Sequence, residues 1–241
     1  MFSIRFMIVT AFAAVAALVI LGLLIWIPES FLITRIVMLV CIGVLILSVA
    51  VFLSIVKILA ICFLVLVGLL IGTLFIPGDP MPTSASYVRR LRACEGIPYV
   101  WGGENWRGLD CSGLLRQGYM QACLFDAVST IDPRLLKKGF EVWLWDASAK
   151  ELLSGYNGRT TDLGIEGTIN SLSEKHLQLG DMAITKDGVH CLAYLGAGEW
   201  ASADPALNKV VITKAPDRDF SWFSSTVRIV RWQALKEVTG R

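Results

Sequence analysis

The sequence has 241 residues, of which 55% are hydrophobic, and it carries 22 Lys and Arg against 20 Asp and Glu. The net charge is therefore close to zero, and the sequence contains no basic stripe, which argues against nucleic acid as a partner. Only four charged residues precede Gly78, namely Arg5, Glu29, Arg35 and Lys57. We therefore expect an apolar N-terminal part, 1–77, and one soluble domain, 87–241.

The N-terminal part predicts membrane-spanning helices. The first apolar run, 6–27, is long enough to cross a hydrocarbon core of ~30 Å. A second run, 36–76, is interrupted only by Lys57, and as one helix it would be about twice as long as a bilayer requires. We divide it at Lys57 and expect three transmembrane helices, at about 6–27, 36–56 and 58–76. Two spans, one of them overlong and tilted, is the alternative.

A cleaved signal peptide is the other interpretation of the N-terminus. It explains the first run but not the second, and no clear small-residue cleavage site follows Ile27. In a three-span anchor Arg5 and Lys57 would share one side of the membrane, and the positive-inside rule then places the N-terminus in the cytoplasm. The soluble domain would face outward, although the arginines at 89, 90 and 92 favour the opposite orientation.

The segment 78–86 is rich in proline and small polar residues and predicts a linker. A short helix over 87–94 is expected after it, with its arginines on the outer face. The six cysteines show no paired CxxC spacing, so we expect neither a metal site nor a disulfide framework.

Cys111 has the surroundings of a reactive thiol. Gly102 and Gly103 predict a loop with unusual backbone angles, and Asp110 is suited to cap a helix over 112–124. Cys111 would then lie at the first turn, where the helix dipole and unpaired N–H groups favour a thiolate. A thiolate is the nucleophile that acyl transfer requires.

These residues carry a specific resemblance. The run PYVWGG at 98–103, followed by DCSGL at 110–114, is similar to the signature around the active-site cysteine of the NlpC-like cell-wall peptidases. The resemblance implies that Cys111 is the nucleophile. It also implies that Tyr99, Asp110 and Ser112 lie on the substrate side of the site.

A second segment resembles the part of the family that carries the histidine. A Gly-Asp turn at 180–181 precedes an expected strand, 182–185, and His190 opens the next strand, which runs to 195. The resemblance implies that His190 is the base. Cys191 is expected to be inert and to point away from His190, because neighbours in a strand alternate between faces. Cys94 and Cys123 are likewise expected to be buried.

The family normally has a third polar group, often a second histidine, that orients the base. Ser202 occupies that position here, and serine is a poor partner for an imidazolium. Asp204 lies two residues further along the same strand face and has the better chemistry. We expect Asp204 to orient His190; Ser202 or a backbone carbonyl are the alternatives.

The segment 126–156 has no counterpart in the resemblance. Its aromatic residues Phe140, Trp143 and Trp145 are more than a plain connector needs. One interpretation is a packed insertion that extends the core. The other is a wall of the substrate groove, or a lid.

The expected fold is α+β: N-terminal transmembrane helices, then a papain-like NlpC-type domain whose nucleophile helix packs on an antiparallel sheet. The resemblance implies a membrane-anchored cysteine peptidase that hydrolyses an amide bond of peptidoglycan stem peptides, without metal or cofactor. It would reside in a bacterial inner or plasma membrane and face the periplasm or cell wall. Two alternatives are an acyl-transfer enzyme for lipids or proteins, and an inactive membrane-tethered binding module.

Overall fold

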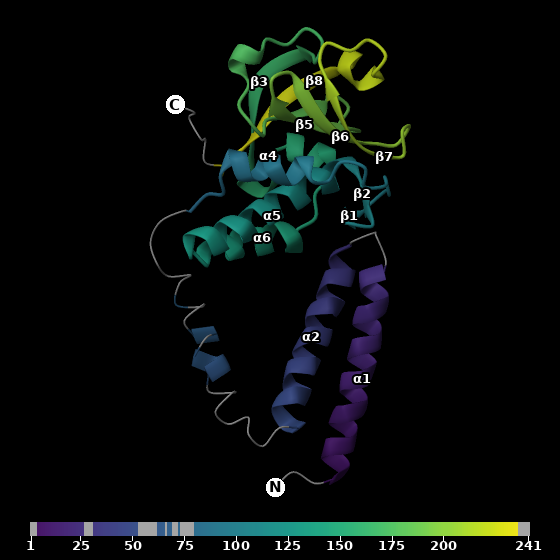
Figure 1. Cartoon of the computed structure of the whole chain (residues 1–241), viewed down its shortest axis with the longest axis vertical. Coiled ribbons are helices and arrows are strands. Elements are labelled where there is room, and N and C mark those ends of the chain that lie inside the picture. Colours follow the sequence, from purple (N-terminus) through teal and green to yellow (C-terminus); the bar gives the residue numbers. More distant parts are fainter. Residues whose placement is uncertain are drawn as a thin grey trace. The chain divides into compact units, whose positions relative to one another are not determined.

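The computed structural model describes residues 4–26, 31–52, 62–65, 67–68, 72 and 80–235. The chain divides into two units, 1–77 and 78–241. Figure 1 shows helices alone in the described part of the first unit, and helices with a sheet in the second.

The first unit contains two apolar helices that pack against each other, α1 (Ile4–Trp26) and α2 (Leu32–Phe52). Within α2, the 19 residues Leu32–Ala50 are long and apolar enough to cross a membrane, and within α1 the shorter stretch Ile8–Leu24 is apolar. In the described residues, therefore, one helix rather than several meets the requirement for a span. The third expected span, 58–76, lies largely outside the described residues.

The second unit is an α+β domain, as predicted. Its helices are α4 (Ser84–Arg92), α5 (Cys111–Thr130), α6 (Arg134–Leu144) and α7 (Ala149–Leu153), with 3-10 turns η1 (Tyr156–Gly158), η2 (Glu174–His176) and η3 (Ser221–Ser224). Its strands are β1 (Glu104–Asn105), β2 (Gly108–Leu109), β3 (Thr160–Thr168), β4 (Met182–Thr185), β5 (Cys191–Gly196), β6 (Glu199–Asp204), β7 (Lys209–Lys214) and β8 (Thr226–Trp232).

The six longer strands form one antiparallel sheet in the order β3-β8-β4-β5-β6-β7. Its centre is built from tight hairpins. The turn between β5 and β6 contains Gly196, Ala197 and Gly198, all with positive φ, which glycine tolerates without strain. The strands predicted at 182–185 and from 190 to 195 correspond to β4 and β5, with His190 immediately before β5.

The sheet has a core on each face because side chains alternate along every strand. Cys191, Ala193 and Leu195 of β5 belong to the cluster that includes α4 and α5, whereas Leu192 and Tyr194 belong to the opposite cluster. Figure 1 shows α4, α5 and α6 on one side of the sheet. This arrangement brings the N-terminus of α5 against β5.

The linker is shorter than predicted. Helix α4 begins at Ser84 and not near residue 87, because the side chain of Thr83 caps it by accepting a hydrogen bond from Ser86 N at 3.1 Å. The small polar residues from which a linker was predicted therefore form the start of α4, and Ser84 and Ser86 are buried there.

The segment 126–156 is a packed insertion. It forms the end of α5 together with α6 and α7, and it places Val142 and Leu152 in the core. Buried Arg116 of α5 holds it by donating hydrogen bonds to Val142 O at 2.5 Å and Trp145 O at 2.8 Å. Arg116 also pairs with Glu104 and Asp146. The first interpretation of this segment is therefore supported by its packing.

Candidate active site

The loop before α5 is built to lie close to the helix. Gly102 has φ +71°, and its N–H donates to Asp110 Oδ2 at 2.9 Å. A Cβ on Gly113 would lie 2.1 Å from Gly103 O, so only glycine allows this approach. The glycine-rich loop and the first turn of α5 therefore form one unit around the nucleophile position.

Asp110 is the N-cap of α5, as predicted. Its Oδ1 accepts hydrogen bonds from Gly113 N at 2.6 Å and from Ser112 Oγ at 3.0 Å. Burial raises the pKa of Asp110 to about 6, and the neighbouring Cys111 adds to this rise, while the hydrogen bonds oppose it. Asp110 and Ser112 thus bond to each other and to the loop.

Cys111 is the first residue of α5, and its side chain is buried beside β5. The pKa of Cys111 lies well below the ordinary thiol value. The largest cause is a hydrogen bond from the thiol of Cys191; burial opposes it, and the hydrogen bond and charge of His190 support it. The site therefore favours a thiolate despite its burial.

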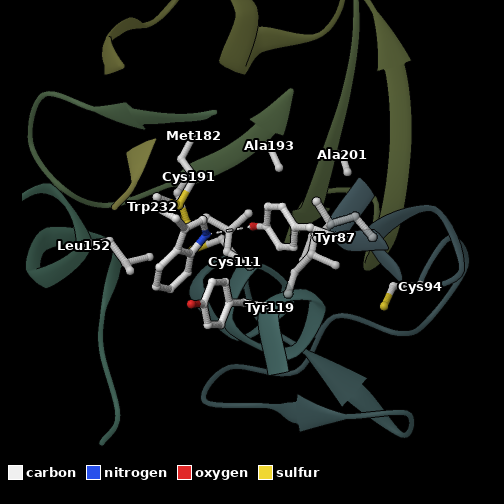
Figure 2. Close-up of a cluster of buried hydrophobic side chains, with 14 of the residues drawn as sticks. Tyr87, Cys94, Cys111, Tyr119, Leu152, Met182, Cys191, Ala193, Ala201 and Trp232 are labelled. Atoms are coloured by element: carbon white, nitrogen blue, oxygen red, sulfur yellow. Dashed lines mark hydrogen bonds between the residues drawn. The ribbon is translucent and has the colours of Figure 1, made fainter. Parts of the chain in front are cut away.

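Cys191 is a residue of the site that sequence reasoning missed. Figure 2 draws it with Cys111 in the same buried cluster. Burial, and after it the neighbouring Cys111, raise the pKa of Cys191 well above the ordinary value, so Cys191 stays protonated beside the nucleophile. Strand alternation does separate it from His190, but it directs Cys191 to the nucleophile.

His190 is held at both its backbone and its ring. Its N–H donates to Thr185 Oγ1 at 2.9 Å, and its carbonyl accepts from Thr185 N at 2.9 Å, which fixes the β4–β5 hairpin. Its Nε2 lies 2.8 Å from Ser202 Oγ. The ring stacks on Trp222 of η3 with centroids 3.9 Å apart and planes at 18°.

Asp204 does not occupy the place predicted for it. Its Oδ2 accepts a hydrogen bond from Trp222 Nε1 at 3.1 Å, and its Oδ1 accepts from Ala206 N at 2.6 Å and Leu207 N at 3.0 Å. Asp204 ends β6 and caps the following turn, so its carboxylate is used there. Ser202, the alternative of the sequence analysis, instead lies within hydrogen-bond distance of His190 Nε2.

Tyr99 lies near these groups. Burial raises the pKa of Tyr99 to about 12, and the charges of Cys111 and Asp110 contribute to the rise. Its backbone N–H bonds to Asn208 O at 3.0 Å, which ties the loop to the β6–β7 turn. Trp101, two residues on, is 73% exposed. Within the described residues, no group of three His, Cys, Asp or Glu side chains could hold a metal ion.

Comparison with known families decides what this arrangement is. The model of the NlpC/P60 family matches residues 96–229, a range that contains Cys111, His190, Ser202 and Trp222. The chain belongs to the NlpC/P60 family.

Several solved structures are similar to this chain. RipB, a peptidoglycan hydrolase of Mycobacterium tuberculosis, is 21% identical, with 66% of this chain and 70% of RipB covered and a TM-score of 0.38. The NlpC/P60 domain of the peptidoglycan hydrolase SagA is 21% identical, with 61% and 97% covered and a TM-score of 0.35. No curated protein matches the chain.

NlpC1 of Trichomonas vaginalis is 15% identical, with 62% of this chain covered and a TM-score of 0.40. The match spans 43% of the length of that protein.

Proposed function

We propose that this NlpC/P60 protein hydrolyses an amide bond in the peptide stems of peptidoglycan, with Cys111 as nucleophile and His190 as its base. The substrate class follows from membership of the family. The observation that carries the chemistry is the position of Cys111 as the first residue of α5, buried against Cys191 of β5, the strand that directly follows His190. Cys191 and His190 lower the pKa of this thiol. Such a thiolate attacks carbonyl carbon without further activation.

The reaction begins with the Cys111 proton on His190. Because Nε2 of His190 is bonded to Ser202, Nδ1 is the nitrogen that serves Cys111. The thiolate attacks the amide carbonyl, and the developing oxyanion is stabilised at the first turn of α5 by the Cys111 N–H. His190 then protonates the leaving amine, and it activates the water that releases the acyl group.

The remaining predicted site residues take supporting roles. Tyr99 lines the approach to Cys111, and the exposed ring of Trp101 offers further apolar surface there. Asp110 and Ser112 bond to each other and to the loop glycines, so we propose that they shape the substrate side of the site by fixing the loop. Ser202 orients the His190 ring directly, and Asp204 acts on it indirectly, through Trp222.

We also propose that the N-terminal unit anchors the enzyme in a bacterial membrane, with the catalytic domain in the periplasm or at the cell wall. The support is the apolar stretch Leu32–Ala50 of α2 and the second apolar helix, α1, packed on it. Anchoring raises the local concentration of the domain at the wall.

Digestion of purified peptidoglycan by the full chain in detergent, with mass spectrometry of the products, tests the proposed reaction. We expect new stem-peptide fragments from wild type and none from Cys111→Ala. Cys94→Ala is the matched control, because Cys94 is also buried but has its pKa raised to about 11 by burial. This control should retain activity.

The other outcomes separate the alternatives. If wild type yields no fragments while Cys111 is still alkylated rapidly near neutral pH, peptidoglycan is not the substrate, and an acyl-transfer enzyme for lipids or proteins is favoured. If Cys111 is not alkylated either, the domain is a binding module without catalytic thiol.

A further inference from the structure

The ring of His190 is contacted on its face as well as at its edge. Ser202 Oγ reaches Nε2 at 2.8 Å and fixes one point of the imidazole. One hydrogen bond leaves the ring free to tilt about that point. Trp222 lies parallel to the imidazole at 3.9 Å, and stacking over the ring face opposes such a tilt.

Trp222 is itself held in place by Asp204. The indole Nε1 donates to Asp204 Oδ2 at 3.1 Å, and Asp204 is 3% exposed. The other carboxylate oxygen is fixed by the backbone N–H groups of Ala206 and Leu207. A chain of contacts therefore runs from the turn after β6, through Asp204 and Trp222, to His190.

We infer that Trp222, locked by Asp204, is a positioning residue for the base, and that this pair supplies the orientation that serine alone provides weakly. Holding the imidazole flat against the indole keeps it directed at Cys111, whose pKa the hydrogen bond and charge of His190 lower. The hydrogen bond from the indole N–H to Asp204 fixes the indole in turn. The inference rests on the proposed role of His190 as the base of Cys111.

Other charged and titratable groups around the nucleophile come from four elements. Asp110 lies at the start of α5, Tyr99 in the preceding loop, Cys191 on β5 and Asp204 on β6. A change confined to the Trp222 ring leaves all of these in place. It therefore isolates the contribution of the stacked indole to the Cys111–His190 pair.

The test is the rate of Cys111 alkylation by iodoacetamide as a function of pH, read by peptide mass spectrometry on the full chain in detergent. Trp222→Leu should lower the rate at pH 6 about tenfold and leave the plateau at high pH unchanged. Trp222→Phe keeps a stacked ring without the N–H and should show a smaller loss. Asp204→Asn should resemble Trp222→Phe.

The double variant Trp222→Phe/Asp204→Asn should be no slower at pH 6 than Trp222→Phe, because the carboxylate acts through the indole. Trp200→Phe is the matched control: Trp200 is buried on the same sheet face and packs on Tyr194 with centroids 5.1 Å apart. A structural role alone would give Trp222→Leu the same profile as Trp200→Phe, and this result would overturn the inference.

The readout does not depend on the substrate. Absence of peptidoglycan cleavage by wild type would contradict the proposed function, whereas the alkylation profiles would still decide the role of Trp222. If Trp222→Leu does not fold, as judged by circular dichroism, Trp222→Phe and Asp204→Asn decide instead; wild-type profiles for both would overturn the inference.

Discussion

At the scale of single residues, the site depends on where protons are held. Cys111 and Cys191 are buried together, yet their pKa values move in opposite directions. Burial is the main cause of the raised pKa of Cys191, whereas Cys191 and His190 together outweigh burial at Cys111. A helix N-terminus alone would offset only part of the free-energy cost of burying a thiolate. Both Cys191 and His190 therefore lower the pKa of the nucleophile.

Replacing Cys191 tests this point. Cys191→Ala removes the neighbouring thiol that is the largest cause of the lowered value, so the pKa of Cys111 should rise. The pH profile of Cys111 alkylation measures the shift. Cys191→Ser keeps a donor at the same position and should stay close to wild type. Equal profiles for the two variants would contradict the role of the hydrogen bond.

The pKa of Asp110 makes a prediction for stability. The folded state binds a proton at about pH 6, whereas the unfolded chain does so near the ordinary value of 3.8. As pH falls from 7 to 4, the folded state takes up this proton first, so the free energy of unfolding should rise by about 1–3 kcal/mol from this group. Asp110→Asn should lack the rise. Urea denaturation at several pH values gives the free energy of unfolding of wild type and of Asp110→Asn. The difference between the two proteins measures the contribution of Asp110.

At the scale of elements, Arg116 joins three parts of the domain. It lies on α5, and its side chain is fully buried. It contacts Glu104 of the β1–β2 hairpin as well as the end of α6. Its side chain thereby links the loop before the nucleophile to the insertion. The insertion is thus part of the support of the site, although it carries none of the proposed catalytic groups.

Arg116→Met should be strongly destabilising, because it leaves the buried carboxylate of Glu104 without its partner. Loss of one member of a buried ion pair costs about 3–5 kcal/mol of the free energy of unfolding. Lys137→Met is the control, since Lys137 makes only an exposed pair with Glu141 at 3.9 Å. Chemical denaturation should show little change for the control. A small effect of Arg116→Met would mean that water replaces the ion pair.

At the scale of the whole molecule, the chain combines an apolar helical unit with an NlpC/P60 domain. The N-terminal unit is either a membrane anchor or a cleaved signal peptide, and the two interpretations differ in whether the unit remains in the mature protein. An anchor remains attached and holds the domain at the membrane, whereas a signal sequence is removed.

Expression of the full chain in bacteria, followed by alkaline carbonate extraction of the membranes, distinguishes the two. We expect the protein in the membrane pellet, with its N-terminal segment intact by mass spectrometry. A soluble product that begins after the apolar segment would contradict anchoring. External protease applied to spheroplasts should digest the domain if it faces outward, and protection of the domain would contradict that orientation.

The family resemblance that the sequence carries implied the α+β class and the place of His190. The residues themselves predicted the helix at Cys111 and the short strands around His190. These features are local: a capping aspartate, glycines that permit a close turn, and alternation along short strands are each contained within a few neighbouring residues. The start of α4 was missed because Thr83 resembles a linker residue until its side chain is seen to cap the helix.

Only the tertiary structure decided which groups surround the two catalytic side chains. By residue chemistry Asp204 was the better partner for His190. In the fold, its oxygens instead accept hydrogen bonds from the turn after β6 and from Trp222. Trp222 reaches His190 from a 3-10 turn more than thirty residues away in sequence, and no local pattern marks it. Contacts between distant segments follow from sheet order and core packing, which a single sequence does not display.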